Sequence, residues 1–256
     1  MFKIATWNVN SLKVRLPYVL EWLESEQPDV LALQETKTID ENFPLEEIQK
    51  AGYFVSYTGQ KTYNGVATFS KTPHETIAKS IPGFEDEQRR ILAINHSGIT
   101  VLNLYVPNGS EVDSDKYRYK LNWFAKLHPF ITELLSSNDR LIVLGDFNIA
   151  PEDCDVHDPQ EWQGNVLVSE PERAEFNTML AHGLVDCFRL FEQEENSFSW
   201  WDYRAAAFRR NRGLRIDHIL ASKTLSESCK KCYIDKRPRK LERPSDHTPV
   251  VAEFDL

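Results

Sequence analysis

Polar side chains that could take part in catalysis or metal binding lie where apolar runs of the sequence end. Glu35 follows residues 30–34, Asp146 follows residues 141–145, and His247 precedes residues 250–254. One such carboxylate is usually a turn residue or a helix cap, but strand ends also position functional side chains. Several in one chain, all Asp, Glu, Asn or His, indicate a shared polar site. The set comprises Asn8, Asn10, Glu35, Asp146, Asn148, Asp217, Asp246 and His247.

These residue types suit phosphoryl chemistry. Mg²⁺ prefers oxygen ligands and keeps several waters, so one or two carboxylates suffice, and Glu35 is the leading candidate. Hydrolysis also needs a positioned water, for which Asp146 is a suitable proton acceptor. Asn148, an uncharged donor, can contact a phosphate without repelling it.

An Asp–His pair can keep an imidazole charged or correctly oriented. His247 and Asp217 are the pair that the sequence favours. The alternative is that His247 is a capping or core histidine, and the residues alone leave that open.

The elements that must position these residues are many short strands and a few helices. Apolar or alternating runs predict strands, and helical periodicity with a Ser169 N-cap before Pro171 predicts helices. This pattern favours one domain over residues 1–256, a two-sheet sandwich flanked by helices. The expected strands are 2–8, 30–34, 53–57, 65–70, 91–96, 100–106, 141–145, 197–201, 216–220, 232–235 and 250–254, and the expected helices 15–25, 45–51, 114–135 and 170–181.

The composition is that of an ordinary globular protein, with 41% hydrophobic and 27% charged residues in 256. We find no apolar run long enough to span a membrane and no leader pattern, so we expect a cytoplasmic protein without a membrane partner. The four cysteines fit free thiols. Cys229 and Cys232 have CxxC spacing, and either a zinc or redox role or two ordinary thiols near a strand fits them.

The charge is unevenly distributed. The net charge is −9, yet residues 203–243 carry 13 Lys and Arg against 4 Asp and Glu. A basic stretch on an acidic body can draw a polyanion to one face, although a solvated basic loop has the same composition.

Six motifs taken together resemble the exonuclease III family of DNA-repair enzymes, in the endonuclease/exonuclease/phosphatase superfamily, and span nearly the whole chain. The Gln-Glu, Gly-Asp-Phe-Asn and Ser-Asp-His motifs mark only the superfamily. Residues 198–204, followed by 212–218, and residues 88–91 resemble the exonuclease III-like branch specifically. The six motifs lie at residues 6–12, 33–37, 104–108, 145–150, 212–218 and 244–250.

The resemblance implies a four-layered, DNase I-like α/β sandwich with the site at one end of its two sheets, and Mg²⁺ or Mn²⁺ as cofactor. It implies that Tyr105 contacts the scissile phosphate and that Asp217 pairs with His247. Whether Asp146 or His247 is the base, and whether one or two metals act, stay open. The implied metal-side residues are Asn8, Glu35, Asp146, Asn148, Asp246 and His247, and the implied catalytic residues are Tyr105, Asp146, Asn148, Asp217 and His247.

The implied activity is cleavage of double-stranded DNA 5′ to abasic sites, with 3′→5′ exonuclease, 3′-end-cleaning and ribonuclease H activities. The expected partner is duplex DNA that is abasic, nicked or 3′-blocked, gripped mainly through its phosphates, and the protein is expected to be a bacterial monomer. Strand alternation requires that one of Trp200 and Trp201 lies in the core. The expected DNA contacts are Asn10, Asn108, Trp200, Trp201, Arg204, Arg209, Arg210, Arg212 and Leu214.

Two departures from abasic-specific animal relatives favour the bacterial branch: Leu214 replaces a Trp, and Asn10 replaces an Asp. Residues 108–116 are polar and acidic, unlike a basic DNA-inserting loop, which leaves the balance of abasic and exonuclease activity open. The alternatives are a phosphatase of lipids or inositol phosphates and a catalytically silent DNA-binding module.

Overall fold

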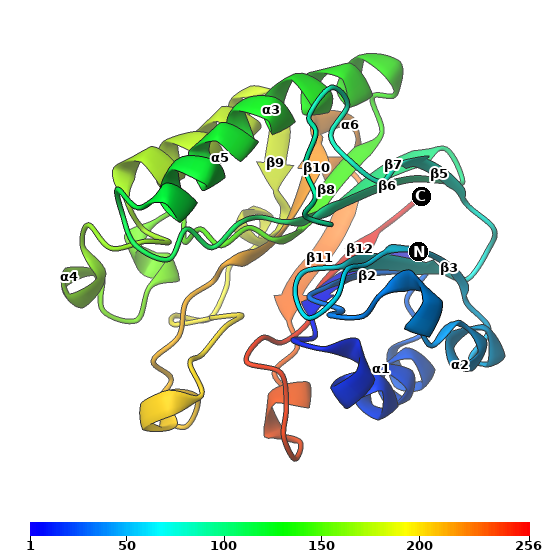
Figure 1. The fold of residues 1–256 in the computed structure, drawn as a ribbon, viewed down its shortest axis with the longest axis horizontal. Helices are drawn as coiled ribbons and strands as arrows, with labels where there is room; N and C mark the ends of the chain where they lie inside the picture. The colour runs from blue at the N-terminus through cyan, green and yellow to red at the C-terminus, as the bar shows by residue number, and fades with distance from the viewer.

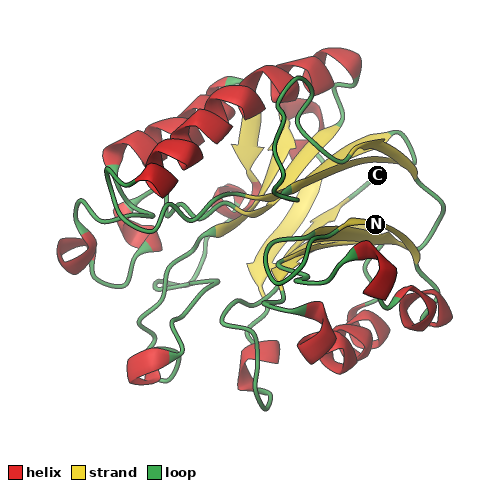
Figure 2. Ribbon diagram, in the orientation of Figure 1, coloured by secondary structure: helices red, strands yellow, loops and turns green.

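The computed structural model describes residues 1–256 and has four layers: two six-stranded mixed sheets packed face to face, with helices on both outer faces (Figures 1 and 2). This is the four-layered α/β sandwich that the sequence predicts.

The first sheet contains both ends of the chain. Its β1 and β2 run parallel, and every other neighbouring pair is antiparallel. In spatial order its strands are β11 (Cys229–Ile234), β12 (Val250–Phe254), β1 (Phe2–Asn8), β2 (Val30–Gln34), β4 (Val66–Ser70) and β3 (Phe54–Thr58).

The second sheet is built in the same way around one parallel pair, β7 and β8. Its remaining neighbours are antiparallel. In spatial order its strands are β5 (Glu75–Ala78), β6 (Ile91–His96), β7 (Ile99–Tyr105), β8 (Leu141–Asp146), β10 (Asp217–Ser222) and β9 (Leu184–Asp186).

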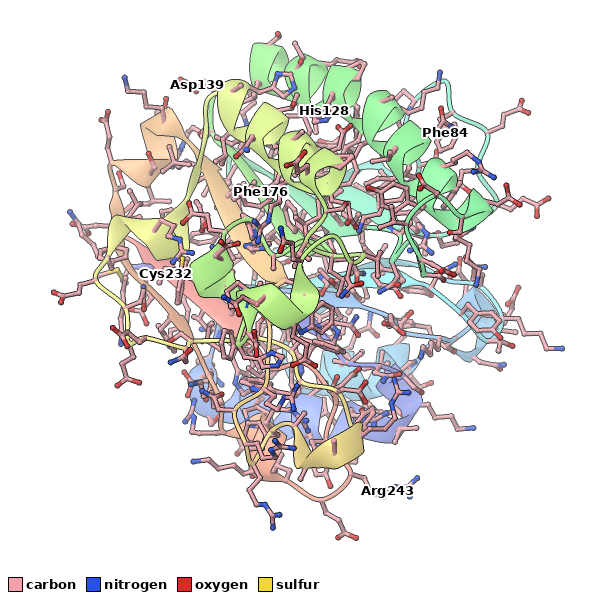
Figure 3. The ribbon with its side chains drawn as sticks, turned by 90° about the vertical axis from the view of Figure 1, so that its left-hand side faces the viewer. Phe84, His128, Asp139, Phe176, Cys232 and Arg243 are labelled. Atoms are coloured by element: carbon pink, nitrogen blue, oxygen red, sulfur yellow. The ribbon has the colours of Figure 1, made fainter.

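Helices cover the outer face of each sheet. α1 (Leu12–Glu26) and α2 (Leu45–Lys50) lie against the first sheet, and α3 (Asp115–Ser137) and α5 (Glu170–Ala181) lie side by side on the second (Figure 3). The short helices are α4 (Pro159–Trp162), α6 (Lys223–Ser226), η1 (Asp40–Asn42), η2 (Asp153–Asp155), η3 (Cys187–Leu190), η4 (Arg204–Ala206) and η5 (Pro238–Lys240).

Three large apolar clusters fill the spaces between the layers. One lies between the two sheets and includes Ile4, Leu144 and Val250. The second lies under α3 and α5, and the third under α1 and α2. Burial of continuous apolar surface on both faces of β2 and β8 explains their unbroken Val, Leu and Ile runs.

Most predicted elements are confirmed, with shifts of a few residues at their ends. Residues 197–201 do not form the predicted strand; they make only isolated bridges, Trp200 with Leu214 and with His247. Two short edge strands, β5 and β9, were not predicted, because three or four residues carry too little periodicity.

The sequence predicted no membrane span and left the role of the two CxxC cysteines open. No helix has the length and apolarity needed to cross a bilayer. Cys229 and Cys232 are buried in the core between the sheets and do not belong to a group of side chains that could hold a metal ion, which favours two ordinary cysteines over a zinc site.

Candidate active site

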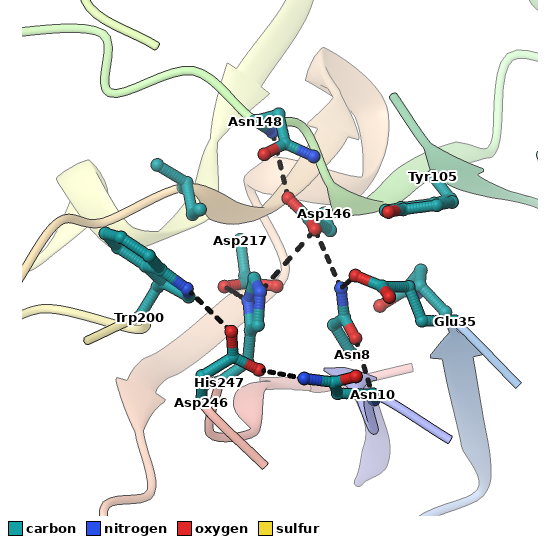
Figure 4. Close-up of polar contacts among 12 residues, drawn as sticks. Asn8, Asn10, Glu35, Tyr105, Asp146, Asn148, Trp200, Asp217, Asp246 and His247 are labelled. Atoms are coloured by element: carbon teal, nitrogen blue, oxygen red, sulfur yellow. Dashed lines mark hydrogen bonds and ion pairs between the residues drawn. The ribbon is translucent and has the colours of Figure 1, made fainter. Parts of the chain in front are cut away.

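The chain brings its polar strand ends together at one end of the sandwich, opposite the end where both termini lie (Figure 1). Glu35 directly follows β2, and Asp146 ends β8. Asp217 begins β10 and stands opposite Asp146 in the antiparallel register. His247 precedes β12, whose first residues pair with the end of β1. The sequence predicts this convergence, and Figure 4 shows it.

The backbone around these residues has an uncommon conformation. Gly145 has a φ of +144°, and a Cβ built on it would lie 1.9 Å from the carbonyl oxygen of Leu104. Only glycine therefore allows β8 to approach β7 this closely and aim Asp146 into the site. Glu35 and Asn148 have φ values of 51° and 48°. Such strained residues gather at functional sites where the surrounding structure holds them.

Asn8 connects the two carboxylates that come from different sheets. Its side-chain Nδ2 donates to Glu35 Oε1 at 2.9 Å and to Asp146 Oδ2 at 2.8 Å. Its Oδ1 accepts the backbone N–H of Asn10 at 2.9 Å. Asn8 therefore fixes the spacing of the carboxylates.

One group of side chains in the molecule could hold a metal ion. Ligand atoms of Glu35, Asp146 and His247 lie within 4.8 Å of one another. Two carboxylates are the donors that a hard divalent cation prefers, so the residues present fit such an ion. These three belong to the six residues expected on the metal side.

The other three expected ligands are occupied by hydrogen bonds within the protein. Asn8 is engaged as described above. The Asn148 Oδ1 accepts from Asn108 Nδ2 at 3.0 Å, and its Nδ2 donates to the Val106 carbonyl at 3.0 Å. Asp246 accepts from Asn10 Nδ2 at 2.9 Å and from Trp200 Nε1 at 3.1 Å. In this structure these residues support the site through hydrogen bonds.

His247 lies between two carboxylates. Its Nδ1 is 2.8 Å from Asp217 Oδ2, and its Nε2 is 3.7 Å from Asp146 Oδ2. Ser199 Oγ donates to the same Asp217 oxygen at 2.6 Å and orients it. Burial alone would lower the pKa of His247, but Asp217 and Asp146 raise this pKa to about 10. The imidazole is therefore held as a cation at neutral pH.

The pKa values of Asp146 and Tyr105 are also raised, and for these two acids a raised pKa favours the neutral form. Burial raises the pKa of Asp146 to about 7, and the neighbouring His247 opposes the shift. Burial, followed by the charge of Glu35, raises the pKa of Tyr105 well above its ordinary value. Tyr105 is therefore a neutral phenol, and the guanidinium of Arg90 stacks 4.6 Å from its ring centre.

Lys37 and Ser199 belong to the site, although sequence reasoning gave them no role. The Lys37 Nζ lies 2.8 Å from Glu35 Oε2 and 2.6 Å from Asn10 Oδ1. The signal for Lys37 was its place two residues after Glu35 in the same motif. Ser199 had no signal of its own, because its role depends on Asp217, 18 residues later.

The predicted DNA-binding residues divide by exposure. The exposed ones are Asn108, Arg204, Arg209 and Arg210. The half-buried ones are Asn10, Trp200 and Arg212. Trp201 and Leu214 were also predicted to contact DNA, but both are fully buried, so neither side chain offers a surface to DNA in this structure. Trp201 packs with Phe198 and Ala207, and Leu214 packs in a cluster under Trp200. The expectation that one of the two tryptophans lies in the core is confirmed.

The basic side chains of residues 203–243 do not all lie on one surface of the protein. Arg215 is buried and pairs with Asp155 and Asp186, and Arg239 is buried against the rings of Trp201 and Phe208. The exposed arginines of residues 204–210 remain on a loop beside the site.

A cavity of about 320 Å³ opens beside the candidate metal site. Its lining includes Glu35, Tyr105, Asp146 and His247, together with Leu167 and Trp200. The volume lies at the low end of ordinary ligand pockets and is large enough for a phosphate with an attached sugar. Charged and polar groups converge on it from both sheets.

A family model described as the endonuclease/exonuclease/phosphatase family matches residues 5–247. The chain belongs to this family. The match includes every strand-end residue described above, so the resemblance seen in the sequence motifs is confirmed.

Relatives within the family align along the full chain. Exodeoxyribonuclease III of Haemophilus influenzae is 38% identical, with 98% of this chain and 99% of the relative covered. A structure of a 3′ phosphatase from Neisseria bound to a product DNA hairpin is 44% identical, with a TM-score of 0.98 and complete coverage of both chains. An AP endonuclease structure from Archaeoglobus fulgidus is 39% identical, with a TM-score of 0.95 and the same coverage.

Proposed function

We propose that this protein is a Mg²⁺-dependent DNA-repair phosphodiesterase that cleaves duplex DNA 5′ to abasic sites and processes 3′ ends. The observation that supports this most is the convergence of Glu35, Asp146 and His247 within 4.8 Å beside the cavity. Relatives that match over the full length are named for nuclease, 3′-phosphatase and AP endonuclease activities.

Glu35 would hold the cation, with Mn²⁺ as a substitute for Mg²⁺, and Asp146 and His247, whose side-chain atoms lie within 4.8 Å, would face the attacking water and the phosphate. A divalent cation bound there supplies charge that polarises the phosphate and stabilises the leaving oxygen. The three residues form one group of ligand atoms. Whether one or two metal ions act there stays open, as it does from the sequence.

Asp146 is the proton acceptor for the attacking water in this proposal. A base works best when its pKa is close to the working pH, and the pKa of Asp146 is raised to about 7. His247 is flanked by Asp217 and Asp146 and carries a proton already. It serves as a positive donor toward phosphate oxygens, which develop charge during attack.

Tyr105 and Asn108 complete the phosphate contacts. The neutral phenol of Tyr105 lines the cavity and donates to a phosphate oxygen without adding negative charge. Asn108 is exposed at the cavity rim, and its Nδ2 orients Asn148. Arg204, Arg209 and Arg210 bind neighbouring DNA phosphates. The partner is duplex DNA, and the protein acts as a single-domain monomer.

A panel of end-labelled duplexes tests this proposal. Purified protein is incubated with Mg²⁺ and four duplexes: intact, nicked, abasic and 3′-phosphorylated. We expect strand cleavage 5′ to the abasic site and release of inorganic phosphate from the 3′ end. Inositol phosphates and phosphoinositide vesicles are run in parallel. Phosphate release from these substrates, with no product from any duplex, contradicts the proposal and favours the lipid or inositol phosphatase reading.

A further inference from the structure

A fully buried ion pair lies behind the wall of the active-site cavity. Lys120 on α3 and Glu172 in the first turn of α5 contact each other directly, and neither side chain has any exposed surface. Neither residue lines the cavity or belongs to the candidate metal site. Burial lowers the pKa of Lys120, and the charge of Glu172 raises it again.

Lys120 holds the backbone of two loops that carry active-site residues. Its Nζ donates to the carbonyl oxygen of Asn148 at 2.7 Å and to that of Asn108 at 3.2 Å. With Glu172, all three donors of the ammonium are used. The two asparagines are bonded to each other through their side chains, so one cation fixes both ends of this contact.

Glu172 holds a third loop. Its Oε1 accepts the backbone N–H of Leu167 at 3.0 Å, and its Oε2 accepts the N–H of Ser169 at 3.3 Å. Leu167 lines the cavity, as Asn108 and Asn148 do. The ion pair therefore ties together three segments of the cavity wall that are distant in the chain.

Two of the three segments need such support because their backbone is strained. Asn148 has a φ of 48° and Leu167 a φ of 77°. Leu167 is a bulky residue for which a positive φ is costly. The strain persists only where neighbouring groups hold the conformation.

We propose that Lys120 and Glu172 are positioning residues for the reaction, which hold Asn108, Asn148 and Leu167 where the phosphate and its sugar must fit. This inference rests on the proposed function. A buried ion pair is a weak source of stability, because loss of hydration offsets the attraction between the charges. Its contribution lies in the geometry of the loops it holds.

The test variant is Lys120→Met combined with Glu172→Gln, which leaves no uncompensated charge in the core. We expect kcat on the abasic duplex to fall about tenfold to a hundredfold, because small displacements of positioning groups have effects of this size. KM is expected to stay within about threefold, because the exposed arginines that bind DNA phosphates are untouched. Lys120→Arg, which keeps a charged donor against Glu172, is expected to retain more kcat than Lys120→Met.

Leu134→Ala is the matched control. Leu134 lies on the same helix, is buried in the core under α3, and does not line the cavity. Both variants are assayed at temperatures where the same fraction is folded. The inference is overturned when the double variant and Leu134→Ala show equal kcat. Should the double variant not fold, Lys120→Gln combined with Glu172→Gln, which also leaves no buried charge, decides: a loss of kcat with KM unchanged supports the inference, and an unchanged kcat overturns it.

Hydrogen exchange separates this inference from the proposed function. The amide of Asn148 is bonded to Asp146 Oδ1, and that of Ala150 to the Leu167 carbonyl. Both amides are expected to exchange faster in the variant than in Leu134→Ala, whether or not any duplex is cleaved. Equal protection in the two variants overturns the positioning role. A wild-type protein that cleaves no duplex overturns the proposed function alone.

Discussion

Asp217 Oδ2 and His247 Nδ1 lie 2.8 Å apart, although 30 residues separate them in the chain. Both side chains are buried, and the other imidazole nitrogen faces Asp146. The hydrogen bond fixes the orientation of the ring and the position of its charge. Asp217 does not line the cavity, so it can influence a group bound there only through His247.

The first prediction concerns this pair. We expect Asp217→Asn and His247→Asn each to lower the rate of abasic-site cleavage, with His247→Asn losing about a hundredfold or more. The double variant is expected to lose little more than His247→Asn, because residues that act as one unit are not additive. Single-turnover rates of the four proteins measure this. Losses that multiply would show that the two residues act independently.

The second prediction concerns the exposed arginines beside the site. Replacing Arg209 and Arg210 with Gln is expected to reduce the slope of log Kd against log salt by about 1.8, because each phosphate contact contributes about 0.9. Replacing Arg212 adds less, since its guanidinium already contacts the carboxylate of Glu161. Fluorescence anisotropy of a labelled duplex at several salt concentrations measures the slope.

A charge-matched control uses Lys230→Gln with Lys231→Gln. These lysines are exposed on β11 near Cys229, which pairs with Phe254 at the end of the sandwich away from the site. Their removal is expected to leave the slope unchanged. An equal change in both double variants would mean that net charge, and not the loop beside the site, binds DNA.

The third prediction concerns stability against pH. Burial, followed by the charge of Arg215, lowers the pKa of His218 from 6.5 to about 4. Between these values the unfolded chain binds a proton that the folded protein does not. The stabilisation is therefore complete above pH 6.5 and is lost as the pH falls toward 4, with a slope of at most about 1.4 kcal/mol per pH unit from this group.

Urea unfolding from pH 7.5 to 4.5 measures this dependence. His218→Gln keeps polar atoms for Arg215 and the Ile149 carbonyl, which His218 contacts at 3.0 and 2.9 Å. The variant is expected to lose less stability over this pH range than the wild-type protein. Parallel curves for the two proteins would show that His218 titrates normally in the folded state.

The sequence predicted the strands that carry the site because their burial leaves a simple signal. β1 and β2 are apolar runs that end at polar residues, and both are found at their predicted bounds. Residues 197–201 alternate like a strand, yet Trp200 and Trp201 are held by side-chain contacts to Asp246 and Asn211 from neighbouring loops. Local patterns do not contain such long-range contacts.

The site was predictable in its carboxylates but not in its support. Glu35, Asp146 and His247 follow or precede recognisable strands, so their convergence could be expected. Lys120 and Glu172 look like solvent-facing charges in helical patterns, and only the packing of α3 on α5 shows that both are buried. Leu214 was expected to contact DNA, because the family motif names a position without giving its depth.

Cleavage of the abasic duplex during a Mg²⁺ titration of metal-free protein tests the central claim most directly. We expect no cleavage in EDTA, full recovery with Mg²⁺, and a half-saturating Mg²⁺ concentration at least about tenfold higher for Glu35→Gln, because a neutral amide replaces a charged ligand. Glu41→Gln, on the outer η1 helix, serves as the control and is expected to match the wild-type protein. Undiminished cleavage in EDTA, or identical titrations for Glu35→Gln and wild type, would contradict a cation-dependent site at Glu35, Asp146 and His247.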